Sequence, residues 1–174
     1  MAASVKNSSS TNVTVNINNC VVEIKAFRDD VVMPTKGTSK AAGYDLCAWT
    51  KDYYEETALV QPGSTLIVKT GLNVNIPENY EIQIRPRSGL AAKSMISVLN
   101  TPGTIDADYC GDGEDFELKV ILVNHGKMPF AIRHGDRIAQ MVICELPKIE
   151  LKEVEEFSSS SNTDRAGGLG STGI

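Results

Sequence analysis

Short runs of alternating apolar and polar residues dominate the sequence between residues 20 and 157. Ile82 and Ile84 are flanked and separated by charged or amide side chains, and apolar residues two positions apart recur at residues 22–26, 66–68, 72–76, 118–122 and 130–132. Clusters of proline, glycine and asparagine separate these runs. Short strands at such intervals are typical of sandwiches and barrels. We therefore expect an all-β, mainly antiparallel fold.

One stretch departs from this alternation. Residues 88–97 contain Leu90, two alanines and Lys93 in succession. These residue types lose little conformational freedom in a helix. We expect at most one short helix, starting after Ser88 and running toward Ser97.

The two ends of the sequence are too polar to build a core. Residues 1–19 contain 11 Ser, Thr or Asn and one charged residue, and residues 158–174 contain 11 Gly, Ser or Thr. Segments this poor in apolar bulk rarely pack on their own. We expect a flexible polar leader at 1–19, one β domain at 20–157 and a mobile glycine-rich arm at 158–174.

Charge, hydropathy and cysteine spacing exclude several classes of partner and metal site. With 17 basic and 22 acidic residues the formal net charge is -5, and no Lys/Arg run offers phosphate contacts, so we expect no nucleic-acid partner. No apolar run approaches the roughly 20 residues of a membrane span, so we expect no membrane partner.

The four cysteines form no Cys-x-x-Cys pair, which argues against zinc. Scattered thiols without a signal-peptide pattern favour a reducing intracellular location, cytoplasmic or nuclear.

Two local motif matches fail on their context. Residues 168–173 fit the pattern G-x-G-x-x-G, but a serine run precedes them where a dinucleotide site needs a strand. Asp106, Asp108, Gly111 and Glu117 fall at calcium-loop positions 1, 3, 6 and 12. Position 5 is Cys110, and the flanks have the pattern of strands, so we do not predict a calcium site.

Five segments combine chemically useful groups with turn-forming residues. They are residues 41–46 with Asp45, 85–91 with two arginines and Ser88, 101–109 with Asp106 and Tyr109, 135–140 with Arg137 and Gln140, and 163–173 with Arg165. Guanidinium groups suit phosphate geometry, glycine-rich backbone can present N–H groups to phosphate, and a carboxylate can activate water. Each segment alone is more often structural.

Taken in this order, the five segments resemble the five motifs of the homotrimeric dUTPase family (deoxyuridine triphosphate nucleotidohydrolases), from Cys20 to Ile174. The resemblance implies a distorted jelly-roll barrel. It also implies a homotrimer, each site taking the 101–109 hairpin from one subunit, the first, second and fourth motifs from a neighbour and the arm from the third. The implied reaction is hydrolysis of dUTP to dUMP and pyrophosphate, which limits uracil in DNA and supplies dUMP for dTMP synthesis.

The resemblance also implies residue roles. Asp106 matches the general base that activates water against the α-phosphate, and Gln140 matches a residue that positions the water. Asp45 matches an acid that contacts Mg²⁺ through water. The implied substrate contacts are Arg87, Ser88, Gly89, Gly103, Ile105, Tyr109, Arg137, Arg165, Leu169, Gly170, Ser171 and Thr172. Among these, Tyr109 matches the ring beneath the deoxyribose, where a 2′-hydroxyl has no room.

Two features depart from the family pattern. Leu169 stands where the family's arm usually has an aromatic residue, so the uracil would lose a stacking contribution of about 0.5–1.5 kcal/mol. We expect weaker substrate capture, and a lower KM in Leu169→Phe. Residues 112–116 form an acidic insertion of about five residues. It could be a tolerated surface loop, an extension of the hairpin tip or a contact with another protein.

Two other functions remain open from the sequence. The related dCTP deaminases share the fold, although the Gly-Ser-Thr-Gly arm and the Asp-x-Asp-Tyr hairpin favour plain dUTP hydrolysis. A non-catalytic nucleotide-binding module is the other alternative. The presence of Asp106, Arg137 and Arg165 argues against it.

Overall fold

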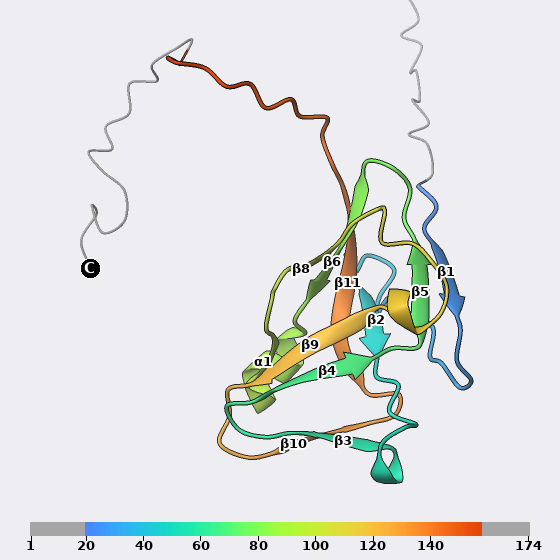
Figure 1. Cartoon of the computed structure of the whole chain (residues 1–174). Coiled ribbons are helices and arrows are strands. Elements are labelled where there is room, and N and C mark those ends of the chain that lie inside the picture. Colours follow the sequence, from blue (N-terminus) through green and yellow to red (C-terminus); the bar gives the residue numbers. More distant parts are fainter. Residues whose placement is uncertain (1–19, 158–174) are drawn as a thin grey trace, which may run out of the picture.

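The computed structural model describes residues 20–157 and shows a mainly antiparallel β fold (Figure 1). Its elements in chain order are β1 (Glu23–Ala26), β2 (Tyr44–Cys47), η1 (Tyr54–Glu56), β3 (Thr57–Val60), β4 (Thr65–Lys69), β5 (Leu72–Asn75), β6 (Tyr80–Arg85), α1 (Ser88–Ser94), β7 (Ile96–Val98), β8 (Gly103–Ile105), η2 (Glu114–Phe116), β9 (Lys119–Asn124), β10 (Phe130–Arg133) and β11 (Arg137–Glu145). The expectation of an all-β fold with one short α-helix is confirmed. The expected leader and arm lie outside the described residues.

The strands of the described region form four antiparallel sheets. The largest has the order β2-β11-β6-β8, and a second has the order β4-β9-β7. Two further pairs, β1-β5 and β10-β3, complete the arrangement. The last described residues, beyond β11, run away from the body (Figure 1). No helix in this part of the chain is long and apolar enough to cross a membrane.

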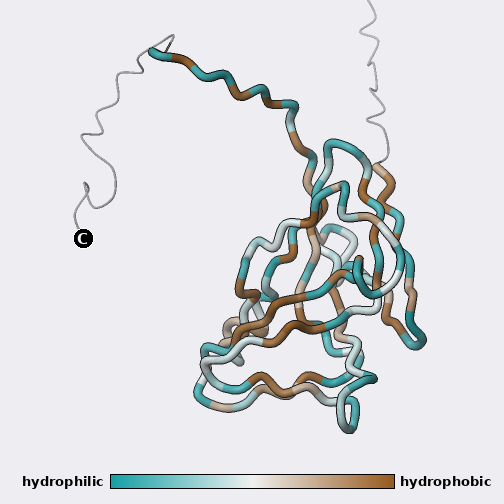
Figure 2. Tube along the Cα trace, viewed as in Figure 1, coloured by the Kyte–Doolittle hydropathy of each residue, from teal (hydrophilic) through white to brown (hydrophobic). Residues whose placement is uncertain are grey.

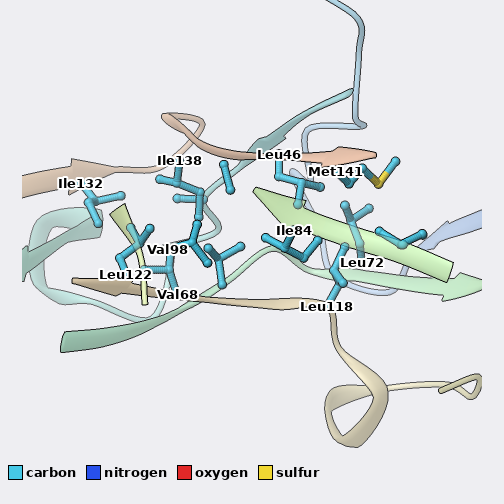
Figure 3. Packing of buried hydrophobic residues seen from close by; sticks show 14 of the residues in the cluster. Leu46, Val68, Leu72, Ile84, Val98, Leu118, Leu122, Ile132, Ile138 and Met141 are labelled. Atoms are coloured by element: carbon cyan, nitrogen blue, oxygen red, sulfur yellow. The ribbon is translucent and has the colours of Figure 1, made fainter. Parts of the chain in front are cut away.

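The alternating residues supply the core, as the sequence indicates. Ile82 and Ile84 in β6 are 0% and 2% exposed, while Gln83 between them is half-buried. Side chains from several sheets meet in one cluster, in which Leu46 lies above Ile84 with Met141 to one side (Figure 3). Apolar residues are correspondingly concentrated along the strands (Figure 2). Burial of each such side chain stabilises the fold by about 1.5–3 kcal/mol.

The longest strand, β11, does not follow the simple alternation. Ile138 and Ala139 are adjacent in sequence and both are buried. The pairing of β11 with β2 shifts register between Arg137 and Ala139, and such a bulge changes which face successive side chains occupy. This shift explains why β11 is not evident from periodicity.

The helix is shorter than expected. The predicted helix runs to Ser97, but α1 ends at Ser94 and Met95 has a left-handed conformation with φ 56. Ile96 and Val98 instead belong to β7, where they are 1% and 2% exposed. Their branched side chains fit a strand paired with β9 better than a helix. The C-terminal boundary of the predicted helix is therefore wrong.

Candidate active site

Asp45 holds two arginines from different parts of the chain. Its Oδ1 accepts a hydrogen bond from Arg87 Nε at 2.9 Å, and its Oδ2 accepts one from Arg137 Nη1 at 3.2 Å. Arg87 also donates from Nη1 to the carbonyl oxygen of Arg137 at 3.1 Å. One carboxylate thus fixes two guanidinium groups side by side. The cluster retains excess positive charge, which suits a phosphate chain.

Gln140 lies next to this cluster because of strand register. In the largest sheet, Gln140 of β11 pairs with Asp45 of β2 on one side and with Arg85 of β6 on the other. The side-chain Nε2 of Gln140 donates to the carbonyl oxygen of Pro86 at 2.9 Å. That bond aims the amide toward the turn that leads into α1.

Gly43 makes room for the Gln140 amide. A Cβ at Gly43 would lie 2.5 Å from Gln140 Oε1 and 3.3 Å from Gln140 Cβ. We expect Gly43→Ala to displace the amide and lower kcat/KM by about tenfold, with little change in melting temperature because a side-chain end can move. Gly37→Ala is the matched control, since a Cβ there meets nothing within 4 Å. Unchanged kinetics in Gly43→Ala would show that Gln140 has no role in turnover.

Ser88 and Gly89 begin α1 directly after Arg87 and are exposed. A hollow of about 260 Å³ adjoins this point and is lined by Arg87, Leu90, Phe130, Asp136, Arg137 and Ile138. The arginines of the cluster therefore face solvent-accessible space rather than the core. The structure brings together Asp45, Arg87, Arg137 and Gln140 as one group, with Ser88 and Gly89 next to it in the chain.

A second hollow lies at the hairpin that contains β8. It has a volume of about 270 Å³ and is lined by Ile67, Ile84, Val98, Asn100, Gly103, Ile105, Tyr109, Glu117, Lys119 and Ile121. The predicted contacts Gly103, Ile105 and Tyr109 are thus brought together. Apolar side chains dominate the lining, beside Asn100, Glu117 and Lys119, which suits a flat base whose edge needs a few polar partners.

Sequence reasoning did not single out Asn100 in this hollow. A Cβ at Gly103 would lie 3.1 Å from Asn100 Nδ2, so the amide packs closely over the glycine backbone. The only sequence signal is its position before the turn Thr101–Pro102–Gly103. Its place in the lining depends on the pairing of β8 with β6, which no local sequence pattern reports.

The hydroxyl of Tyr109, one of the lining residues, is held by a hydrogen bond. It donates to the carbonyl oxygen of Glu117 at 3.0 Å. The ring meets Phe116 edge-on, with centroids 6.0 Å apart. Burial raises the pKa of Tyr109, and nearby Glu117 and Asp115 raise it further. The phenol therefore stays neutral and its orientation is fixed.

Asp106 does not join the Asp45 group within one chain. It follows Ile105, which pairs with Ile82 of β6, whereas Gln140 pairs with Arg85. Ile82 and Arg85 are three positions apart in β6, which corresponds to about 10 Å along a strand. Since β8 is antiparallel to β6, Asp106 continues away from Arg85. The predicted base and the predicted phosphate ligands therefore form two separate groups.

The remaining predicted contacts are Arg165, Leu169, Gly170, Ser171 and Thr172. All five lie outside the described residues, so their placement stays a prediction. The same holds for the expected effect of Leu169→Phe.

Comparisons with known proteins identify the family of this chain. The dUTPase family model matches residues 29–173. A deoxyuridine 5'-triphosphate nucleotidohydrolase from Hydrogenobaculum sp. (strain Y04AAS1) is 44% identical over 151 residues, covering 87% of this chain and 96% of that protein.

Solved structures of phage dUTPases are also similar. One is a variant from Staphylococcus bacteriophage 80alpha with dUpNHpp, which has a TM-score of 0.73 at 27% identity and covers 88% of this chain and 99% of that one. Another is a variant from phage phi11 of S. aureus, described with a structural Mg(II) ion, which has a TM-score of 0.68 at 27% identity and covers 80% and 99%. The family match and the 44% identity show that this chain belongs to the dUTPase family.

Proposed function

We propose that this chain hydrolyses dUTP to dUMP and pyrophosphate, with Asp106 activating the attacking water. The observation that carries the proposal is the pair Arg87 and Arg137, held by Asp45 beside Gln140. Fixed cations of this kind stabilise the charge that phosphates carry in a phosphoryl-transfer transition state. Removal of dUTP would limit uracil in DNA, and the dUMP formed would supply dTMP synthesis.

The proposed step begins with a water beside the exposed Asp106 carboxylate. The carboxylate takes a proton from that water, whose oxygen forms a bond to the α-phosphorus. The bond between the α-phosphorus and the bridging oxygen to the β-phosphate breaks, and that oxygen leaves with pyrophosphate. Gln140 helps to orient the water and the α-phosphate. Arg137 and, from the arm, Arg165 bind the phosphate oxygens.

Mg²⁺ fits this site only as an ion carried by the substrate. The described residues contain no group of three His, Cys, Asp or Glu side chains that could hold a metal alone. Both oxygens of Asp45 already accept hydrogen bonds from arginines, so Asp45 would contact the ion through its water ligands. Magnesium keeps several waters and prefers phosphate oxygens. When bound, the ion would neutralise part of the triphosphate charge.

We infer that the complete site forms between copies of the chain. Support comes from the separation of Asp106 from the Asp45 group, which leaves neither group sufficient for the reaction. In a homotrimer, the β8 hairpin of one copy would face the arginine group of a neighbour, and the third copy would contribute its arm with Gly170, Ser171 and Thr172. Most soluble homo-oligomers have closed symmetry, so every copy in such a trimer would take part in equivalent sites.

Uracil selection would come from the hollow around β8. Backbone groups near Gly103 and Ile105 would pair with the uracil edge, and the close fit would exclude a 5-methyl group. Cytosine exchanges donor and acceptor at position 4, which would leave buried polar groups unpaired. Tyr109 would lie beneath the deoxyribose and exclude ribose.

We also propose an intracellular location, cytoplasmic or nuclear. The four cysteines are all free thiols, which is typical of a reducing compartment.

The proposal is tested by pyrophosphate release from dUTP, dCTP, dTTP and UTP in parallel, with magnesium, and by ammonia release from dCTP. Release from dUTP alone is expected. Ammonia release from dCTP would assign the chain to the deaminase branch. No turnover of any nucleotide, with tight dUTP binding retained, would identify a binding module and contradict the proposal.

A further inference from the structure

The acidic insertion at residues 112–116 folds back onto the protein. Its Gly113 exchanges two hydrogen bonds with the side chain of Asn73 in β5: Nδ2 donates to the Gly113 carbonyl at 2.9 Å, and Gly113 N–H donates to Oδ1 at 3.0 Å. Asn73 is only 3% exposed. This paired bond fixes both the position and the direction of the insertion, which a freely tolerated surface loop would not need.

Charged side chains hold the next residue of the insertion. The carboxylate of Glu114 lies 3.2 Å from Arg28 and 3.1 Å from Lys69. Lys119 donates to the Glu114 carbonyl oxygen at 2.9 Å. The Lys69 hydrogen bond lowers the pKa of Glu114. Each exposed pair is weak alone, but three cations from three different segments converge on one residue.

The end of the insertion forms the support for Tyr109. Phe116 meets the tyrosine ring edge-on, and its own ring packs so closely on Gly111 that a Cβ there has no room. The tyrosine hydroxyl donates to the carbonyl of Glu117 at 3.0 Å and approaches that of Asp115 at 3.4 Å. Both the ring and the hydroxyl of Tyr109 are thus held by residues 115–117.

Glu117 makes this support rigid. Its side chain is fully buried, and Oε1 accepts a hydrogen bond from Gly71 N–H at 2.7 Å. Its Oε2 lies 3.4 Å from Arg28, whose guanidinium stacks over Trp49 at 4.5 Å from the ring centroid. The carbonyl that receives the tyrosine hydroxyl is therefore attached to a fixed residue.

We propose that residues 112–116 are a positioning element for Tyr109 that sets the preference for deoxyribose over ribose. A Tyr109 ring fixed by its contacts with residues 115–117 can exclude a 2′-hydroxyl, whereas a Tyr109 ring that is free to tilt would admit one. The inference rests on the proposed function, and Phe116 acts through Tyr109 rather than on the substrate.

The test compares kcat/KM for dUTP and UTP in wild type and Phe116→Ala. We expect the ratio of the two values to fall by about tenfold, mainly through a higher KM for dUTP and partly through faster UTP turnover. Asn73→Ala, which removes both bonds to Gly113 from outside the insertion, should move the ratio in the same direction. Thermal unfolding identifies a variant that does not fold, in which case the other variant decides.

Lys25→Ala is the matched control. It breaks the exposed 2.9 Å pair between Lys25 and Asp112 and should leave the ratio unchanged. If both folded variants keep the wild-type ratio, the insertion does not position Tyr109 and this inference is wrong, while the proposed function stands. A wild type that does not hydrolyse dUTP would instead overturn the proposed function.

Discussion

Replacement of Asp106 with asparagine is expected to lower dUTP hydrolysis by about 10³-fold. Asparagine keeps the size and a hydrogen-bonding oxygen, but it cannot take a proton from water at neutral pH. Binding of dUTP should persist, because the arginine group and the β8 hollow are untouched. Single-turnover pyrophosphate release measures the loss, and calorimetric titration with a non-hydrolysable dUTP analogue measures binding.

Asp108→Asn is the matched control for this variant. Asp108 is a carboxylate two residues away, is exposed as Asp106 is, and has no role in the proposed step. It should retain near wild-type turnover. Equal losses in both variants would mean that the charge of the hairpin matters rather than a base at Asp106, and would contradict the assignment.

Replacement of Glu117 with alanine is expected to lower the free energy of unfolding by about 3 kcal/mol. The side chain is fully buried, and its carboxylate accepts hydrogen bonds from Gly71 N–H and from the Arg28 guanidinium. Its removal leaves the Gly71 N–H without its acceptor and takes one of two carboxylate partners from the largely buried Arg28, which keeps Glu114 at 3.2 Å. Urea unfolding, followed by the fluorescence of the single tryptophan, Trp49, measures the change.

Glu117→Gln separates the causes of that loss. Glutamine retains an acceptor for Gly71 N–H but loses the charge opposite Arg28, so its loss should be smaller than that of alanine. Both variants must be compared at one protein concentration, because assembly contributes to apparent stability. A loss below about 1 kcal/mol in Glu117→Ala would show that water replaces the carboxylate at little cost.

Local patterns predicted the fold where one face of a strand is buried. Ile82 and Ile84 show this in β6. The sequence pattern did not predict the strand β11, because Ile138 and Ala139 are adjacent and both are buried beside a bulge. The helix boundary at Ser94 could not be read from propensity, since Ile96 joins β7 through pairing with a strand further along the chain.

In the site, too, local motifs predicted which residues matter but not how they are arranged. The motifs indicated Asp45 and Gln140, but only the pairing of β2 with β11 shows that they are neighbours. The acidic composition of residues 112–116 suggested contact with solvent or with another protein. In the structure the insertion instead contacts Asn73, Arg28 and Lys69, which belong to segments distant in the sequence. Such nonlocal contacts leave no trace in a short window of sequence.

The central claim is that Asp106 of one copy works with the arginine group of another. Co-expression of Asp106→Asn with Arg137→Met tests it most directly, because each variant damages a different group. Each variant alone should be nearly inactive. The whole randomly assembled population should recover about a quarter of wild-type turnover, because about a quarter of all sites combine an intact Asp106 with an intact arginine group, and each mixed trimer has one such site. Mixed trimers, verified by mass, that recover no activity would show that each chain supplies both groups to its own site and would contradict the account.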